Sequence, residues 1–203
     1  LSTWYCLILR SVKFKYKNLD IISMSLPSSG GILIGQMLKV IEDYDIKSFG
    51  HNSVKAIQLL VEAERRAYAD RSHFMGDPDY MDLPVYELID KEYVVDRMKN
   101  FSWDKATSSS DVKHGNIILN ESDETTHYSI IDKHGNSVSV TTTLNNSYGS
   151  KVFVEEGGFF LNNEMDDFSS KPGHPNFYGL IGSEANSIQP GKRMLSSMTP
   201  SII

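Results

Sequence analysis

Residues 125–145 of this chain read TTHYSIIDKHGNSVSVTTTLN, and the fold is predicted outward from this stretch. Two runs rich in β-branched and aromatic residues flank a polar turn with a glycine, which is typical of a β-hairpin. A three-residue loop from Lys133 to Gly135, with the glycine in the left-handed conformation, places Asp132 opposite Asn136.

The register of this hairpin decides which side chains share a face. With the three-residue loop, Ile130 lies opposite Val138 on an apolar face, and Thr125 lies opposite Thr143 at the open end. A two-residue loop would slip every pair by one position and mix the two faces, so we reject it. The predicted hairpin therefore ends in two facing threonines.

The composition bounds the class of protein. The chain has 203 residues, 40% of them hydrophobic and 23% charged, which suits one soluble globular domain with a full core. A formal net charge of -6 argues against a nucleic-acid partner, because binding phosphate requires a basic surface. Cys6 is the only cysteine, so no internal disulfide can form and packing must hold the fold.

The opening of the chain, residues 1–10, is apolar but too short to span a bilayer. It also lacks the charged start and the small-residue cleavage site of a signal peptide. We expect a strand or an irregular start of the chain there.

The first half of the chain predicts one strand and several helices. Residues 19–24 look like a buried strand, and a break at 27–31 leads into a helix over 32–43. The Ser-Ser-Gly-Gly sequence in this break lacks the lysine of a phosphate-binding loop, so we interpret it as a tight strand-to-helix joint. Further helices are predicted over 54–72 after a Ser53 cap, after Pro84, and over 91–98 after an Asp90 cap.

The long helix over 54–72 carries an apolar stripe that should face the core. Its members recur at helical spacing and are Ile57, Leu60, Val61 and Tyr68. Glu64 falls on the same stripe, and we interpret it as an edge carboxylate or as the partner of an arginine in a structural ion pair.

Turns and loops dominate the rest of the chain. The turn at 76–79 has too few oxygen ligands for a calcium loop, so we predict no metal site. Residues 107–111 and 120–124 predict an exposed linker before the hairpin. Two strands at 151–154 and 159–161 should follow it, then a turn at 162–167. Residues 169–191 are rich in Gly, Pro, Ser and Asn and predict a long irregular loop that acts as a functional lid.

Four motifs in this order resemble the γ-glutamyltranspeptidase family. They are Thr-Thr-His-Tyr-Ser at 125–129, the run at 141–145, Leu-Asn-Asn-Glu-Met-Asp-Asp-Phe at 161–168, and Leu-Ser-Ser-Met at 195–198. The resemblance extends over residues 19–203 and leaves residues 1–18 unmatched. It implies an N-terminal-nucleophile hydrolase, an α+β protein built as an αββα four-layer sandwich, which would be incomplete in this chain.

The resemblance further implies that the chain cuts itself between Glu124 and Thr125. Residues 19–124 would then be the C-terminal part of a large-subunit region, and residues 125–203 the N-terminal part of a small-subunit region. Both would come from one precursor and share one domain.

The chemistry of Thr125 agrees with such a cut. A threonine hydroxyl is a weak nucleophile until a base takes its proton, and no Ser-His-Asp motif or nucleophile elbow supplies a base here. Cleavage before Thr125 would free its α-amine, whose reference pKa of about 7.7 to 8.0 suits a general base. Thr143, across the hairpin, is predicted to hydrogen-bond the Thr125 hydroxyl, and Thr141 is the weaker candidate. From the pattern alone, all three would be ordinary strand threonines.

Substrate-binding residues are implied by the same resemblance. The ammonium group of a γ-glutamyl substrate would be bound by Asn145, Glu164 and Asp167. Its α-carboxylate would be bound by Ser196 and Ser197. Carboxylates suit the ammonium because charge-assisted hydrogen bonds are the strong ones. In the lid, Tyr178 corresponds to a gate, although the same residue could simply anchor the loop.

The implied activity is acyl transfer without a cofactor. The γ-glutamyl group would pass from glutathione or a related amide to water or to an amino-acid or peptide acceptor. The family's carboxylate-binding arginine and oxyanion-hole glycines match nothing here, so the chain resembles a central fragment. A periplasmic or extracellular location is implied as well.

Two alternatives remain open. One is a related acylase of the same fold that cleaves other side-chain amides, against which the pair Glu164 and Asp167 argues. The other is an uncut, non-catalytic binding protein that keeps the pocket.

Overall fold

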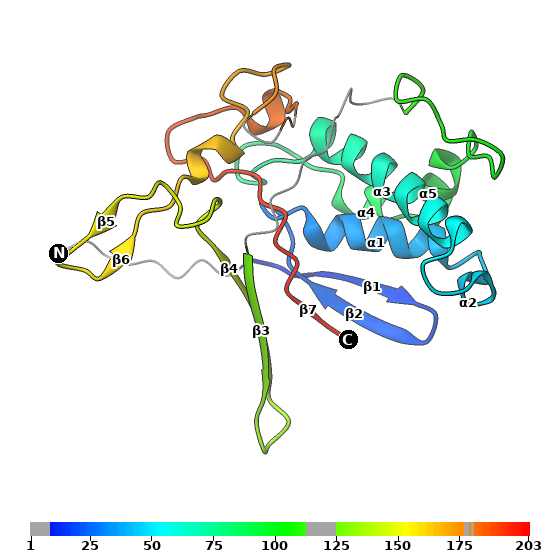
Figure 1. Ribbon diagram of the computed structural model, residues 1–203, viewed down its shortest axis with the longest axis horizontal. Coiled ribbons are helices and arrows are strands. Elements are labelled where there is room, and N and C mark those ends of the chain that lie inside the picture. Colours follow the sequence, from blue (N-terminus) through cyan, green and yellow to red (C-terminus); the bar gives the residue numbers. More distant parts are fainter. Residues whose placement is uncertain (1–8, 113–124, 177–178, 180) are drawn as a thin grey trace.

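Helix α1 (Gly30–Ile41) forms the centre of the fold, because it packs against a β-sheet on one side and against helix α3 (Val54–Phe74) on another (Figure 1). The computed structural model describes residues 9–112, 125–176, 179 and 181–203. Within these residues the fold is mixed α+β. The helix predicted over 32–43 is confirmed, with its start moved back to Gly30.

A three-stranded antiparallel sheet supports α1. Its strands, in spatial order, are β1 (Val12–Tyr16), β2 (Leu19–Ser23) and β7 (Ser201–Ile202). The strand predicted over 19–24 is confirmed, but only one of its faces is buried: Ile21 is 3% exposed, whereas Ile22 is 39% exposed. Ile22 pairs with Ile202, so the end of the chain lies beside its first strands.

The main hydrophobic core fills the space between α1, the sheet and α3. Val12 and Phe14 of β1 point into it and meet Ile32 and Leu33 of α1. Ile32 is fully buried, and Val12 is 1% exposed. Burial of such side chains stabilises the fold by roughly 1.5 to 3 kcal/mol each.

Helix α3 buries only part of the stripe that the sequence predicts, since Tyr68 is confirmed as a core residue at 7% exposure. Ser53 caps the helix as expected, and its hydroxyl accepts a hydrogen bond from the Ala56 N–H at 3.2 Å. The predicted stripe is wrong for Ile57, Leu60 and Val61, which are 48%, 36% and 43% exposed.

The buried face of α3 combines apolar residues, among them Leu59 and Ala63, with charged ones. Glu62, Arg66 and Asp70 are 2%, 3% and 1% exposed and recur at helical spacing. Glu62 forms ion pairs with Arg65 and Arg66, and Asp70 pairs with Arg97 at 3.1 Å. Paired charges can be buried where isolated ones cannot. A count of apolar residues alone therefore misplaces the buried face.

Shorter elements complete the helical layer. They are α2 (Ile46–Phe49), α4 (Val85–Leu88) and α5 (Lys91–Arg97). The predicted start of α4 at Pro84 is confirmed, and so is the Asp90 cap of α5, whose carboxylate accepts from the Glu92 N–H at 2.9 Å. No helix of the described ranges is both long and apolar enough to cross a membrane.

The predicted linker is exposed over 108–111, whereas Thr107 is half-buried and hydrogen-bonded to α3. The Thr107 N–H donates to Glu62 at 2.9 Å, and the Arg65 guanidinium donates to the Thr107 carbonyl at 2.8 Å. Residues 120–124 lie outside the described residues.

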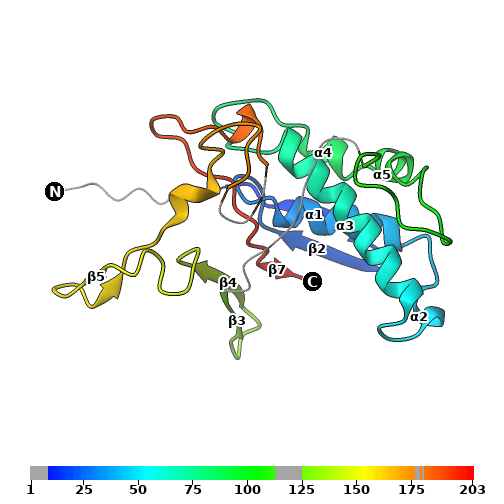
Figure 2. The ribbon, with the colours of Figure 1, turned by 45° about the horizontal axis from the view of Figure 1, so that its top comes forward.

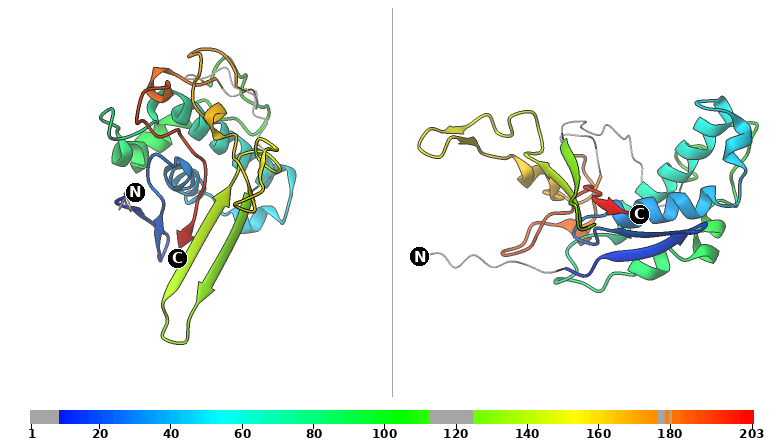
Figure 3. Two further views of the ribbon diagram at one scale, coloured as in Figure 1. Left: turned by 90° about the vertical axis from the view of Figure 1, so that its left-hand side faces the viewer. Right: turned by 90° about the horizontal axis from the view of Figure 1, so that it is seen from below.

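The predicted hairpin register is confirmed in β3 (Thr125–Ile131) and β4 (Ser137–Thr143). Thr125 pairs with Thr143 and Ile130 with Val138, and Gly135 has a φ of +85° in the three-residue loop. The hairpin extends away from the helices (Figure 3). Its apolar face is open, since Ile130 is 56% and Val138 51% exposed.

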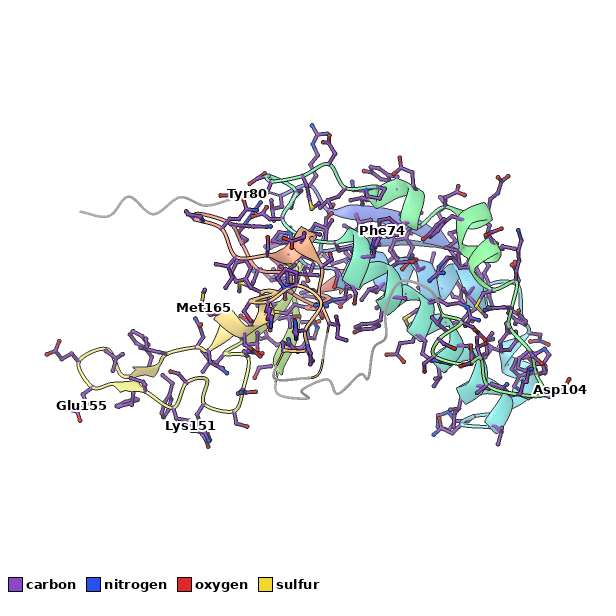
Figure 4. All side chains as sticks on the ribbon, turned by 90° about the horizontal axis from the view of Figure 1, so that it is seen from above. Phe74, Tyr80, Asp104, Lys151, Glu155 and Met165 are labelled. Atoms are coloured by element: carbon purple, nitrogen blue, oxygen red, sulfur yellow. The ribbon has the colours of Figure 1, made fainter. Side chains whose placement is uncertain are left out.

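A second, smaller hairpin forms an arm at the opposite side of the molecule from α2 (Figure 2). Its strands are β5 (Phe153–Val154) and β6 (Phe159–Phe160), shorter than the predicted strands at 151–154 and 159–161. Figure 4 shows Lys151 and Glu155 on this arm and Met165 nearer the body. Met165 belongs to the 3-10 helix η1 (Glu164–Asp167), at the predicted turn. The loop at 169–191 is irregular as predicted, apart from the 3-10 helix η2 (Glu184–Asn186).

The joint between β2 and α1 is as tight as the Ser-Ser-Gly-Gly sequence predicts. A Cβ added to Gly31 would lie 2.2 Å from the Met24 carbonyl oxygen, and one added to Gly30 would lie 1.9 Å from the Thr199 hydroxyl oxygen. Both glycines are therefore required by close approach of other segments.

Gly31→Ala should lower the free energy of unfolding by about 1 to 3 kcal/mol, because the new methyl group overpacks a backbone carbonyl. Gly35→Ala in the same helix is the matched control. Its Cβ would meet the movable Ile89 side chain at 3.0 Å, and alanine favours a helix over glycine by about 1 kcal/mol. Urea unfolding of both variants measures the difference. A Gly31→Ala protein as stable as the wild type would contradict the tight joint.

Candidate active site

The two threonines at the open end of the β3–β4 hairpin begin the site. Thr125 opens β3 and pairs with Thr143 at the end of β4. The Thr143 hydroxyl oxygen accepts a hydrogen bond from the Asn145 N–H at 3.0 Å. Glu124 and the side chain of Thr125 lie outside the described residues, so their predicted roles stay predictions. Thr141 is engaged elsewhere, with its hydroxyl 2.8 Å from His127 Nδ1.

Asn145 leads from the hairpin to the carboxylates. It is 9% exposed and has a φ of +74°, a left-handed conformation that asparagine tolerates better than most residues. Its side-chain amide donates to the Asn163 carbonyl at 3.2 Å, and Asn163 directly precedes η1. The predicted Asn145 therefore lies beside the turn that carries Glu164 and Asp167.

The carboxylates of η1 are electrostatically strained. Burial raises the pKa of Asp167 to about 6, although the nearby Arg71 guanidinium lowers it; the charges of Glu164 and Asp166 raise it further. Burial also raises the pKa of Glu164 above its ordinary value. A bound cation would favour the ionised form of both groups. The arrangement is thus suited to an ammonium group.

Asn186, at the end of η2, connects Asp167 with the segment that carries Ser196. Its amide donates to the Asp167 carbonyl at 2.7 Å, and its side-chain oxygen accepts from the Leu195 N–H at 3.0 Å. Asn186 is 6% exposed, so both bonds are sheltered from water. No motif in the sequence marks this residue.

Ser196 is held at the N-terminus of α1. Its carbonyl oxygen accepts from the Ser29 N–H at 2.8 Å and from the Ser29 hydroxyl at 2.8 Å. The Arg71 Nε in turn donates to the Ser29 hydroxyl at 3.0 Å. Arg71 and Ser29 are both buried, and no sequence motif marks them as site residues.

A small cavity of about 40 Å³ lies among these groups. Its lining includes Asp167, Arg71, Asn186 and Leu195, together with parts of the loop at 169–182. The predicted residues Thr143, Asn145, Glu164, Ser196 and Ser197 do not belong to this lining.

The structure thus links the predicted residues by a chain of contacts rather than around one cavity. Tyr178 lies outside the described residues, and the gate stays a prediction. Within the described parts of the chain, no group of three or more His, Cys, Asp or Glu side chains is placed to hold a metal ion. A chain of contacts between residues so far apart in sequence leaves no periodic signal in the sequence.

Comparisons with known proteins identify the family of the chain. The family model described as Gamma-glutamyltranspeptidase matches residues 1–203. This range includes residues 1–18, which the four motifs left unmatched and which contain β1. The chain is 47% identical over 188 residues to the glutathione hydrolase proenzyme of Escherichia coli strain K12, covering 93% of this chain and 32% of that protein. It is 38% identical over 189 residues to the acylase ACY 1 proenzyme of Pseudomonas sp. strain SE83, covering 93% of this chain and 31% of that protein. The chain therefore spans about a third of the length of these relatives.

A solved structure supports the fold. The chain matches the crystal structure of cephalosporin acylase from Bacillus halodurans with a TM-score of 0.69 and 19% identity, covering 94% of this chain and 31% of that one. At this identity the likeness concerns the fold alone. The mixed α+β structure thus corresponds to part of that larger fold.

Asn186→Ala should lower the free energy of unfolding by about 1 to 3 kcal/mol for each partner left unpaired, because the Asp167 carbonyl and the Leu195 N–H lose a buried partner. Gln189→Ala, an exposed amide of the same loop, is the matched control and should change stability by less than about 0.5 kcal/mol. Thermal unfolding of both variants measures the difference. Equal stabilities would exclude Asn186 as a bridge between the two segments.

Proposed function

The chain belongs to the γ-glutamyltranspeptidase family, and from this premise we propose that it carries the junction of a self-cleaving enzyme that transfers γ-glutamyl groups. The observation that carries the proposal is the hairpin register, which places Thr125 opposite Thr143 and leads through Asn145 to the carboxylates of η1. The donor would be glutathione or a related γ-glutamyl amide. The acceptor would be water, an amino acid or a peptide.

The first step we propose is the cut before Thr125. The Thr125 hydroxyl oxygen attacks the Glu124 carbonyl carbon, and the peptide C–N bond breaks to leave an ester and a free α-amine. Water then hydrolyses the ester, so Glu124 becomes a C-terminal carboxylate and the Thr125 hydroxyl is restored. The same residue then holds both a nucleophile and its base.

The second step is acyl transfer. The α-amine accepts the proton of the Thr125 hydroxyl, whose oxygen attacks the γ-carbonyl carbon of the donor. The amine product leaves with a proton, and water or an acceptor amine then releases the γ-glutamyl group from the ester. Thr143 is proposed to hydrogen-bond the reacting hydroxyl in both steps.

Substrate recognition would use two regions, one with negative charge and one at a helix N-terminus. The ionised carboxylates of Glu164 and Asp167, with Asn145, would bind the ammonium of the glutamyl group. Ser196 and Ser197 would bind its α-carboxylate beside the N-terminus of α1, where the helix dipole favours an anion. The contacts of Ser29 with Ser196 support this position.

The longer protein would complete an αββα four-layer sandwich. The open apolar face of the β3–β4 hairpin supports this proposal, because such a face is normally covered. Both subunits would derive from one precursor, and we place the protein in the periplasm or outside the cell on the family resemblance.

An acylase for other side-chain amides is the second candidate, favoured by the 38% identity to the acylase ACY 1 proenzyme. The two carboxylates of η1 favour a substrate with an ammonium group over one without it. Assays with γ-glutamyl-p-nitroanilide and glutaryl-p-nitroanilide discriminate the two, because faster turnover of the glutaryl amide would identify the acylase.

Thr125→Ala should leave one uncut chain in the full-length protein, because the attacking hydroxyl is removed. Thr126→Ala, the next strand residue, is the control and should still be cut. Intact-protein mass spectrometry reads both results. Splitting of Thr125→Ala at the same bond would refute the mechanism, and a wild type that remains one uncut species would favour a binding protein.

The ammonium site should lose affinity in acid. Asp167 has a pKa of about 6, so protonation below that pH removes the charge that binds the ammonium, and KM for γ-glutamyl-p-nitroanilide should rise by up to about tenfold per pH unit. Since this pKa lies above the reference value, the contribution of Asp167 to stability is fullest below about pH 4 and is lost as the pH rises through 6.

Asp167→Asn should raise KM at pH 8 and flatten its rise in acid, while the chain is still cut. Asp166→Asn is the matched control and should keep the pH dependence. An Asp167→Asn enzyme with an unchanged KM would remove Asp167 from the pocket.

A further inference from the structure

A buried ion pair links the turn after α3 to the segment that carries Ser196. Asp77 is fully buried, and its carboxylate accepts from the Arg193 backbone N–H at 2.8 Å and from Arg193 Nε at 2.9 Å. Arg193 Nη2 also bonds both Asp77 and, at 2.6 Å, the exposed Asp79. This fork of parallel hydrogen bonds defines both the distance and the orientation of the two residues.

Other contacts join the same two segments. The Tyr80 hydroxyl donates to the Pro190 carbonyl at 2.7 Å, and a Cβ on Gly76 would lie 2.2 Å from the Ala185 carbonyl oxygen. Figure 4 shows Tyr80 at this edge of the molecule. Residues 73–80, which are the end of α3 and the turn after it, are thus packed against residues 183–193.

The fork lies two residues before Leu195 and three before Ser196. Beyond Arg193 the backbone is tied at Leu195 to Asn186 and at Ser196 to Pro27 and Ser29. The backbone of Arg193 and of Ser196 is therefore held by residues more than 100 positions away in the sequence, Asp77, Pro27 and Ser29. Arg193 is the only charged member of the set, and its partner Asp77 keeps a pKa below the ordinary value because of hydrogen bonds from Arg193 that outweigh burial.

Asp77 and Arg193 also lie on opposite sides of the Glu124–Thr125 bond. We propose that this pair positions the segment carrying Ser196 and Ser197 for the α-carboxylate of the substrate, and that it holds the two pieces together after the cut. The inference rests on the proposed function, which it deepens by naming the positioning pair. Neither residue touches the substrate; both act through the register of residues 193–197.

A pair that only stabilised the fold would predict a different pattern of effects. Loss of general stability lowers the amount of active protein and leaves KM unchanged. Loss of register moves Ser196 and Ser197 away from the carboxylate, which raises KM and leaves the turnover of saturated enzyme largely intact. The two roles are therefore separable by kinetics.

The test compares Asp77→Asn with Asp79→Asn in the full-length protein. Asp79→Asn removes only the exposed partner of the same guanidinium and is the matched control. With γ-glutamyl-p-nitroanilide, Asp77→Asn should raise KM about tenfold or more and change kcat by less than about threefold, whereas Asp79→Asn should stay within about twofold of wild type. Arg193→Lys keeps the charge but loses the fork, and should fall between them.

Amide hydrogen exchange measures how firmly residues 193–196 are held, and it does not require an active enzyme. The amides of Arg193, Leu195 and Ser196 should exchange at least about tenfold faster in Asp77→Asn than in Asp79→Asn, with α1 unchanged. Under denaturant too weak to unfold the wild type, the two pieces of Asp77→Asn should separate on gel filtration. If Asp77→Asn does not fold, KM and hydrogen exchange are measured on Arg193→Lys instead.

Unchanged exchange and an unchanged KM in these variants would overturn the proposal. An inactive, uncut wild type with the expected exchange pattern would instead overturn the proposed function and leave the positioning pair standing. The two failures are therefore distinguishable.

Discussion

The structure depends on the close approach of residues 27–31 to residues 196–199. Ser28 and Ser29 are fully buried, and their hydroxyls donate to the Met198 and Ser196 carbonyls at 2.5 and 2.8 Å. Gly30 and Gly31 have no room for a side chain here. This contact starts α1, brings β7 beside β2 and sets the position of Ser196. Segments from the two ends of the chain thus form one joint core.

Hydrogen bonds and ion pairs of polar side chains fix the irregular loops of this molecule that lie outside the apolar core. The Glu62 and Arg66 pair on α3 anchors Thr107, in the segment that leads toward the proposed cut. Asn186 and the Asp77–Arg193 pair do the same for the segment that leads to Ser196. Because buried polar groups must find partners, each of these bonds specifies one arrangement of otherwise irregular loops.

The candidate site differs from its surroundings in its electrostatics. Asp167 and Glu164 sit close together, partly buried, with pKa values raised by that burial. Such strain is typical of functional sites, where a ligand supplies the missing charge. The contacts around it are hydrogen bonds of Asn186 and Ser29 and the ion pair of Asp77 with Arg193.

The sequence by itself determined the local features: the hairpin and its register, the caps at Ser53 and Asp90, and the glycine joint. These follow from residue spacing and turn chemistry, which act between near neighbours. The same local logic failed on α3 for Ile57, Leu60 and Val61, which stay exposed while paired charges share the buried face with other apolar residues.

Only the tertiary structure decided how Asp167, Asn186, Ser29 and Arg71 come together, and that Asp77 meets Arg193. Their hydrogen bonds join residues far apart in the chain, such as Ser29 to Ser196. No spacing rule records such contacts, because they result from packing the two ends of the chain into one core. The sequence therefore predicted the residues of the site through resemblance, and the folded chain supplied the contacts that position them.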